Sequence, residues 1–555
     1  MTGGTLITRM ARIVAPAALL LAVASASPAG NERKFFDDDP LVREPDSQNA
    51  TAVQPWDIDL FWDLAENLFS RPGDPTPNVA AGNINTIDEV PDSSWFTNRI
   101  LARPLSVDEV IGGPLTGSGP AAGNWTVGRK QGGFAPGFTM TDTKGDQWFV
   151  SFDAHGFPEA ATGAIAVANK IFWALGYWQV ENHLVSIRPD QLVVAPTALV
   201  TPPSGKARAM KISDIEEVLR RAHRSADGSY RAVAARAVPG KTLGGFRYYG
   251  TRPDDPNDIV PHEHRRELRA LKVFGAWTNL VDMKAGNTLD TLITSDGRSI
   301  VRHYLQDVGS TFGTGANGPR EYDEGWEYLH DGGLVWRRLL TLGFVIRPWQ
   351  TVDYEKNAAI GRFEGDAFDP IEWKPRVATA AFLRARSDDT FWAARRVMAF
   401  SDEMIRAIVN TGQYSDPAAS KLLADVLIAR RDKIGKTYLP AINPVINVAL
   451  SPDGTLSFEN AAVAAGVAAA PRGGYTVKWA RFDNATGTAT DIGTSSATES
   501  GRTSAPSPLP SENGVYLKLE IRAVQPPNAS WAEPASVFFR RIDGGWKLVG
   551  LERRK

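Results

Sequence analysis

The sequence predicts an α+β protein with more than one domain, and three observations support this prediction. The chain has 555 residues, which is too long for one ordinary hydrophobic core. Residues 125–153 read as short strands separated by turns, whereas residues 388–435 show helical periodicity. Beyond Pro444 the pattern returns to short strands between Gly, Ser, Thr and Pro turns. We therefore expect a β-rich part, then a helical part, and then a second β-rich part.

The N-terminus has the pattern of a secretory signal peptide. Arg9 and Arg12 precede the apolar run 13–24, and a small-residue Ala-Ser-Ala segment ends at Ala26. We therefore assign residues 1–26 to a signal peptide. The run is too short to span a membrane comfortably, and no later stretch is long and apolar enough, so we expect no transmembrane span in the mature form.

Composition narrows the class of protein further. Hydrophobic content of 43% and charged content of 22% are ordinary for a soluble globular protein. The formal net charge of −2 gives no overall field that favours nucleic acid, so we expect no nucleic-acid partner. The chain has no cysteine, and export without disulfides favours a bacterial periplasm or cell surface. We expect an exported protein, periplasmic or extracellular.

Residues 27–124 read as an irregular N-terminal extension with one helix. Polar residues dominate to about residue 50, and helical spacing of apolar residues follows from Trp56 to Phe69. The remainder is rich in Pro, Gly and Asn. We expect it to wrap around the folded part and to pack through its aromatic residues.

Residues 125–240 predict a small β-rich lobe. Two strands joined by the Gly-rich loop 128–133 precede a third strand that ends at Asp153. Backbone N–H groups of such a loop are able to face an anion, although an ordinary β-meander has the same pattern. Pro158 and Glu159 then begin a helix that ends at Gly176.

Residues 241–443 predict a helical large lobe. A helix fits from His262 to Leu280 and leads directly into Asp282. Further helices are predicted between Asp388 and Gly412, and another runs from the N-cap Asp416 to Gly435. His262 and His264 have the spacing of half a zinc site, but the seven histidines are scattered and the chain has no cysteine, which disfavours a metal there.

Residues 444–555 predict a small all-β sandwich domain. Strand-like runs occur at 476–482, 515–522, 536–541 and 546–551, with turn residues between them. We expect this domain to bind a protein or a cell-surface glycan.

One segment carries residues of the kind that phosphoryl transfer needs. Asp282, Lys284 and Asn287 lie on one short loop, and a hairpin then returns the chain to Asp307 and Gly309. Phosphoryl transfer needs a carboxylate for the hydroxyl proton, a cation near the phosphate, and oxygen ligands for Mg²⁺. A polar loop and a hairpin on an unrelated fold have the same pattern, but the Asp-x-Gly placed after the hairpin favours a site.

In the order of its elements and in these motifs, residues 125–435 resemble the divergent branch of the protein-kinase-like fold that includes HipA-like, phosphatidylinositol-kinase-like, CotH-like and secreted kinases. The resemblance implies a two-lobed domain that binds ATP and Mg²⁺. It implies that Asp282 is the catalytic base and that Lys284 contacts phosphate. It also implies that Asn287 and Asp307 hold the metal, and that Gly132 and Gly133 lie in the loop that covers the nucleotide.

The sequence departs from this family at the position of the lysine that normally holds the nucleotide phosphates. The aligned strand has Ser151 there, and a neutral hydroxyl cannot replace an ammonium against a triphosphate. The acid that pairs with that lysine is missing from the middle of the following helix, and Glu159 lies at the helix start instead. Arg129 or Lys130 of the Gly-rich loop is our candidate for the missing cation.

Three functions follow from these observations. The first is an exported phosphotransferase that uses ATP and Mg²⁺ on a hydroxyl acceptor. The alternative is a catalytically impaired kinase-like protein, a pseudokinase, that binds a nucleotide or another ligand at the cell surface or in the periplasm. The third is a hydrolase or wall-binding protein that uses the acidic loop from Glu321 to Glu327, although exposed carboxylates are more often solvated than catalytic.

Overall fold

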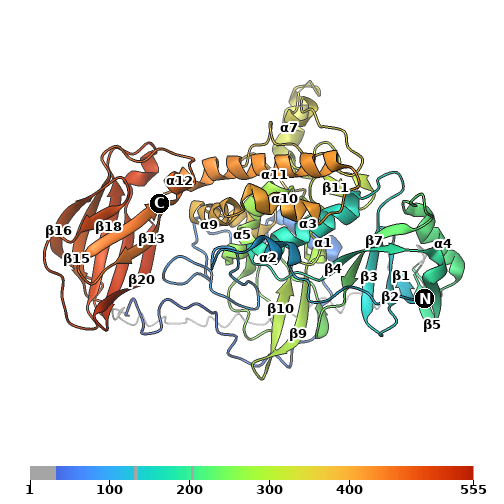
Figure 1. Ribbon diagram of the computed structural model, residues 1–555, viewed down its shortest axis with the longest axis horizontal. Coiled ribbons are helices and arrows are strands. Elements are labelled where there is room, and N and C mark those ends of the chain that lie inside the picture. The colour runs from blue at the N-terminus through green and yellow to red at the C-terminus, as the bar shows by residue number, and fades with distance from the viewer. Residues whose placement is uncertain (1–32, 131–134, 202–204, 345, 554–555) are drawn as a thin grey trace, which may run out of the picture.

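The computed structural model describes residues 33–130, 135–201, 205–344 and 346–553. The predicted signal peptide, residues 1–26, and the loop glycines Gly132 and Gly133 lie outside the described residues. The chain forms a mixed α+β structure with several sheets (Figure 1). No helix within these described ranges is long and apolar enough to cross a membrane.

The N-terminal extension is mostly irregular and contains two α-helices where one was predicted. α1 (Leu60–Ala65) begins later than expected because the carboxylate of Asp59 caps it, accepting from the backbone N–H of Phe61 and of Trp62 at 3.0 Å. It continues into the π-helical turn η1 (Glu66–Ser70). The second helix, α2 (Val107–Gly112), starts with a Ser–Glu capping box.

Aromatic and ionic contacts hold the extension against the rest of the chain. The ring of Trp95 stacks on His303 with 3.5 Å between centroids. Near the N-terminus, Phe35 is buried against Phe538, 5.1 Å away. The guanidinium of Arg266 forms an ion pair with Asp88 at 2.6 Å. The extension is therefore part of the folded core, as its aromatic residues predicted.

Strands between residues 125 and 236 form a seven-stranded sheet with the order β4-β7-β3-β2-β1-β5-β6. Neighbouring strands are antiparallel except β1 and β5, which pair in parallel. Its strands are β1 (Trp125–Lys130), β2 (Gly137–Thr141), β3 (Gln147–Phe152), β4 (Asn182–Ile187), β5 (Leu192–Val200), β6 (Arg208–Ala209) and β7 (Tyr230–Arg236).

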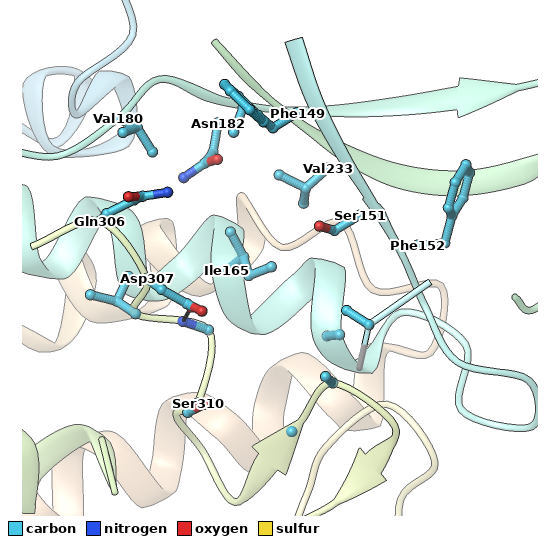
Figure 2. Close-up of a pocket in the computed structure, with 17 residues that line it drawn as sticks. Phe149, Ser151, Phe152, Ile165, Val180, Asn182, Val233, Gln306, Asp307 and Ser310 are labelled. Atoms are coloured by element: carbon cyan, nitrogen blue, oxygen red, sulfur yellow. Dashed lines mark hydrogen bonds between the residues drawn. The ribbon is translucent and has the colours of Figure 1, made fainter. Parts of the chain in front are cut away.

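Helices cover the two faces of this sheet. Alternate residues of β3, namely Trp148, Val150 and Phe152, pack in a core with α4 (Ile212–Arg221). The opposite face, which carries Ser151, looks toward α3 (Ala160–Leu175) (Figure 2). α3 ends at Gly176, as predicted, with φ of 123° at that glycine.

The predicted helix from His262 to Leu280 is wrong as a single element. The chain forms the 3₁₀ turn η3 (His262–His264), then α5 (Arg266–Arg269) and α6 (Leu271–Thr278). The backbone N–H of Arg266 donates to the side-chain oxygen of Asn83 at 2.9 Å instead of to a carbonyl one turn earlier. A side chain of the N-terminal extension therefore interrupts the helical hydrogen bonding.

Around and after α6 lie two small sheets and further helices. A three-stranded sheet has the order β10-β9-β8. The elements are β8 (Lys241–Gly244), η4 (Ala285–Asn287), β9 (Leu289–Ser295), β10 (Arg298–Tyr304), β11 (Thr314–Gly315), β12 (Gly318–Pro319), α7 (Gly332–Leu340), η5 (Pro348–Gln350), α8 (Ala380–Arg384), α9 (Ser387–Met398), α10 (Asp402–Asn410), α11 (Pro417–Tyr438) and η6 (Leu439–Ala441).

The last long helix, α11, starts at the predicted N-cap, where the carboxylate of Asp416 accepts from the backbone N–H of Ala418 at 2.9 Å. It does not end at Gly435, as predicted, but continues to Tyr438. Gly435 lies inside the helix. A glycine is needed there because α9 packs so closely that a Cβ would overlap the sulfur of Met398.

The C-terminal part consists of a three-stranded and a five-stranded sheet, with orders β13-β14-β17 and β16-β15-β18-β19-β20. The two sheets meet where the ring of Phe458 packs against that of Tyr475, 4.9 Å away. Four of the strands were predicted. The elements are β13 (Val445–Leu450), β14 (Thr455–Asn460), α12 (Ala461–Ala464), β15 (Tyr475–Phe482), β16 (Ala489–Ala497), β17 (Arg502–Ser504), β18 (Tyr516–Ala523), η7 (Ala529–Ala532), β19 (Ala535–Ile542) and β20 (Gly545–Arg553).

Candidate functional site

A cavity lies between the small-lobe sheet, helix α3 and the segment that follows β10 (Figure 2). Ser151 and Val233 line it from the sheet, Ile165 from α3, and Asp307 from the segment after β10. The remaining lining residues are Ala135, Phe149, Phe152, Ala161, Val180, Asn182, Ala235, Gln306, Val308, Gly309, Ser310, Gly315 and Ala316. The sequence-predicted Asp307 and Ser151 therefore lie on opposite sides of one cavity.

The loop with Asp282 runs beside the segment with Asp307. Backbone hydrogen bonds join Phe312 N to Thr278 O at 2.8 Å and Asp307 N to Asn287 O at 3.0 Å. Helix α6 ends just before this loop, because Asn279 adopts a left-handed conformation with φ of 56°. These contacts bring together two short segments that β9 and β10 separate in the sequence.

Asp282 is held as an anion by two cations. Its carboxylate lies 2.8 Å from Lys284 Nζ and 3.8 Å from an Arg320 guanidinium nitrogen. Burial raises the pKa of Asp282, but the charge and hydrogen bond of Lys284, together with the charge of Arg320, outweigh burial and leave the pKa below its usual range. An ionised carboxylate is able to accept a hydroxyl proton, which is the role that the sequence predicted.

Asn287 lies between the two acidic residues of the site. Its side-chain nitrogen donates to the backbone carbonyl of Asp282 at 2.7 Å, and its side chain is buried. Its own backbone carbonyl accepts from Asp307, as described above. The predicted catalytic loop and the predicted metal ligand are thus linked through one residue.

Asp307 is exposed at the edge of the cavity. Its carboxylate accepts from the backbone N–H of Gly309 at 3.0 Å, which fixes its orientation. A Cβ at Gly309 would lie 2.8 Å from Ile165 Cγ1 and 3.3 Å from the Asp307 carboxylate. The glycine of the Asp-x-Gly motif is therefore required by the close approach of α3.

The part of the cavity between β3 and α3 is lined by the uncharged side chains of Ser151 and Ile165 (Figure 2). Glu159 does not reach this position: its carboxylate accepts from the backbone N–H of Ser415 at 2.8 Å. Its backbone N–H donates to the buried carboxylate of Asp153 at 3.0 Å, so Glu159 is occupied at the start of α3.

Neither proposed substitute cation lines the cavity as far as the described residues define it. Arg129 is exposed on β1. Lys130 lies near Asp214 of α4, the helix on the other face of the sheet. A hydrogen bond from Arg208 and, to a smaller extent, the charge of Lys130 lower the pKa of Asp214 to about 2. The structure thus separates these two residues from Ser151 and Asp307.

The oxygen donors of the site suit a hard divalent cation. Asp307 offers an exposed carboxylate and Asn287 a carboxamide oxygen, which are the ligand types that Mg²⁺ accepts. Mg²⁺ commonly keeps several waters and takes one or two protein ligands plus substrate phosphates, so this pair fits it. Among the described residues, no group of three or more His, Cys, Asp or Glu side chains is arranged to hold a metal by itself.

The alternative sites are held in local contacts. His262 bonds to Asp258 at 2.7 Å, and His264 to Asp74 at 3.0 Å, so each imidazole already has a carboxylate partner. In the acidic loop, Glu324 pairs with Arg376 at 2.6 Å, and Glu327 pairs with Arg347 at 2.7 Å. These carboxylates are engaged in ion pairs, which disfavours the hydrolase hypothesis.

Sequence reasoning missed Arg320, which lies close to Asp282 and donates to the hydroxyl of Ser310 in the cavity wall. The residue follows the short strand β12 in a Gly-rich loop, where no periodicity points to a site. Only the fold brings this second cation to the Asp282 carboxylate.

No known family model matches the chain, and no curated protein matches its sequence. Two similar solved structures are those of the Golgi casein kinase. The first, with Mn and ADP bound, has 9% identity and a TM-score of 0.29, and the match covers 59% of this chain and 73% of the kinase. The second has the same identity and TM-score, with 72% and 93% covered. At this TM-score the likeness carries no weight, so the interpretation depends on the site geometry.

Proposed function

We propose that this protein is an exported kinase-like phosphotransferase that uses ATP and Mg²⁺ on a hydroxyl acceptor. The observation that carries the proposal is the pair of hydrogen bonds through Asn287, which join the loop of Asp282 to the segment of Asp307, a residue that lines the cavity. The antiparallel strands β1, β2 and β3 followed by helix α3 support the small-lobe layout that the family resemblance implies.

Each residue of the site has a defined role in this proposal. Asp282 accepts the proton of the acceptor hydroxyl while the hydroxyl oxygen attacks the γ-phosphorus of ATP. The bond between the γ-phosphorus and the bridging oxygen then breaks, and that oxygen leaves with ADP. Lys284 and Arg320 provide positive charge beside that carboxylate and the transferred phosphoryl group. Asn287 and Asp307 would hold Mg²⁺, which neutralises charge on the phosphates when bound.

The second candidate function is nucleotide or ligand binding without transfer. Ser151 and Ile165 support it, because the cavity has no ion pair at the position that normally clamps the α- and β-phosphates. In both candidates the protein acts outside the cytoplasm, and the C-terminal β sheets attach it to a protein or glycan partner. The two candidates differ in catalysis, and the second also includes a ligand other than a nucleotide.

A thermal-shift series on the mature chain with ATP, ADP and other nucleotides, with and without Mg²⁺ or Mn²⁺, tests both candidates. A metal-dependent rise in Tm with a nucleotide is the expected result, and no rise with any nucleotide would overturn the phosphotransferase and the nucleotide-binding form of the second candidate. Phosphate transfer from labelled ATP to the protein or to added acceptors then separates them. Transfer that disappears in Asp282→Ala supports the phosphotransferase, whereas binding without transfer supports the second candidate.

A further inference from the structure

Helix α7 projects from the large lobe with no buried side chain (Figure 1). The carboxylate of Asp331 caps its start, accepting from the backbone N–H of Leu334 at 3.1 Å, and the chain turns back near Gly343. The large apolar side chains of this segment have exposed fractions between 54% and 89%. They are Val335, Trp336, Leu339, Leu340, Leu342, Phe344 and Ile346. So many large apolar side chains gathered on one projection mark an interaction surface.

Apolar and basic residues occupy different sides of α7. At 100° per residue, the exposed apolar positions 335, 336, 339 and 340 share one side, and Arg337 and Arg338 lie on the other, with the half-buried Leu334 between them. Neither guanidinium forms an ion pair with any residue in the described part of the chain, and residues 332–352 contain no Asp or Glu. A short helix with aromatic and aliphatic residues on one side and arginines on the other is typical of helices at a membrane interface.

The π-helical turn η1 and helix α1 extend the apolar surface toward the candidate site. Phe69 of η1 is 70% exposed, and its ring lies 5.0 Å from His330, just before α7. Phe61 and Trp62 of α1 are also exposed, and Leu60 packs beside Gly286 in the loop between Asp282 and Asn287. Exposed apolar side chains therefore flank both the start of α7 and the candidate catalytic loop.

We propose that α7 and the apolar residues Leu342, Phe344 and Ile346 dock on an anionic lipid bilayer, with Arg337 and Arg338 at the headgroups and the apolar side chains below them. The nine-residue helix is roughly 14 Å long, about half of what a bilayer crossing needs, so it lies in the interface. Two unpaired arginines with no acidic neighbour in the segment favour anionic lipid, since each contributes attraction near such a surface. Docking also suggests the acceptor: if the proposed phosphotransfer is correct, the acceptor hydroxyl belongs to a bilayer component. This inference about the acceptor rests on the proposed function.

Sedimentation of the mature chain with vesicles tests the proposal, using phosphatidylglycerol/phosphatidylethanolamine vesicles and neutral phosphatidylcholine vesicles. The wild type should sediment with the anionic vesicles. The triple variant Trp336→Ser/Leu340→Ser/Phe344→Ser should bind at least about tenfold more weakly, because apolar area no longer leaves water. The variant Arg337→Gln/Arg338→Gln should lose about tenfold on anionic vesicles and little on neutral ones.

The matched control is Ile259→Ser/Ile371→Ser, which replaces apolar residues that are 75% and 64% exposed elsewhere. The control should bind vesicles as the wild type does, and all variants should keep the wild-type Tm. Absence of vesicle binding, or equal binding by the triple variant, would overturn the proposal. So would a self-association of the wild type that the triple variant abolishes, because a second copy would then cover α7.

Docking and phosphotransfer fail independently in these experiments. Vesicle binding needs no nucleotide, so Asp307→Ala should sediment with anionic vesicles as the wild type does. A chain that binds vesicles but transfers no phosphate contradicts only the phosphotransferase. A chain that transfers phosphate but ignores vesicles contradicts only the docking surface.

Discussion

The side-chain amide of Asn287 donates to the backbone carbonyl of Asp282 at 2.7 Å, and through this bond one residue orders both acidic segments of the site. The backbone carbonyl of the same asparagine accepts from Asp307 at 3.0 Å. Asn287 is buried, so water does not compete freely for these bonds. The relative position of the proposed base and the proposed metal ligand is therefore built into the backbone of the loop.

Replacing Asp307 with Asn should abolish the metal-dependent part of nucleotide binding. The substitution keeps the size of the side chain but removes the exposed anionic ligand. The Tm rise with ATP and Mg²⁺ should fall to that seen with ATP alone. Asp296→Asn, at the turn between β9 and β10, is the control and should behave as the wild type. An unchanged metal effect in Asp307→Asn would rule out this residue as a ligand.

The missing clamp should be restorable by a paired substitution. Ser151→Lys alone places an ammonium in a cavity where Ile165 offers no acid, so it should lower the Tm. The double variant Ser151→Lys/Ile165→Glu should regain stability, because the ammonium then has an acidic partner. It should also bind ADP at least about tenfold more tightly than the wild type, because a fixed positive charge beside the phosphates strengthens nucleotide binding. Isothermal titration with ADP measures this. Equal affinity for the wild type and the double variant would show that the nucleotide phosphates lie elsewhere.

Arg129→Ala and Lys130→Ala test whether Arg129 or Lys130 replaces the missing lysine at the nucleotide phosphates. If either residue replaced the missing lysine, its loss would weaken ATP binding sharply. Because Lys130 lies near Asp214 and neither residue lines the described cavity, we expect less than about a threefold change in the dissociation constant. Arg320→Gln, which removes a cation beside Asp282, should lower the transfer rate more than either alanine variant does. A tenfold loss of affinity in Lys130→Ala would contradict this expectation.

The pKa of Asp282 predicts how its contribution to folding stability changes with pH. Its folded pKa lies below its unfolded value near 4, so the contribution is present above about pH 4 and is lost as the pH falls through the folded pKa. The unfolding free energy of the wild type relative to Asp282→Asn should therefore decrease as the pH falls from 5 to 3. Urea denaturation of both proteins across this range measures the difference.

Lys284→Met tests whether Lys284 is the group that lowers the pKa of the Asp282 carboxylate. Without the ammonium, burial dominates and should raise the pKa of Asp282, so protonation should then favour the folded state. The unfolding free energy of Lys284→Met relative to Lys284→Met/Asp282→Asn should therefore increase as the pH falls. An unchanged slope would show that Lys284 does not set the ionisation of Asp282.

The buried ion pairs within the helical part should be essential for stability. The carboxylate of Asp389 contacts Arg266 at 3.0 Å and Arg269 at 3.2 Å, and all three side chains are fully buried. Asp389→Ala should cost about 3–5 kcal/mol because it leaves two buried guanidinium groups without this partner. Asp425→Ala, which breaks an exposed pair with Lys421, should cost at most about 1 kcal/mol. Similar losses in the two variants, measured by urea denaturation, would contradict the argument.

Local signals predicted several elements well. Gly176 ends α3 and Asp416 caps α11, because the conformational freedom of glycine and the reach of a cap are local properties. In the site, Asp282, Asn287 and Asp307 were chosen from residue type, their order around a hairpin and the family resemblance, and the structure brings their segments together. The ligand, the metal and the transfer reaction stay predictions.

Other features depend on contacts between residues far apart in the chain. The break before α5 comes from Asn83, which lies far upstream and takes the backbone N–H of Arg266. Helix α7 was not predicted, because its segment reads as part of a loop with aromatic and proline residues. Arg320 had no local pattern that would link it to Asp282. Such contacts are invisible to methods that consider neighbouring residues only.

The sequence by itself determined the α+β class and the caps at Gly176 and Asp416, and it predicted Asp282, Asn287, Asp307 and Ser151 as residues of the candidate site. Periodicity, turn chemistry and side-chain type are properties of short segments, so they can be recognised in the sequence before the fold is known. Only the tertiary structure decided where Lys130 and Arg320 lie, which groups neutralise the buried arginines, and that α7 stays exposed. Those outcomes follow from packing and charge pairing across the whole chain, where the position of each group depends on all the others.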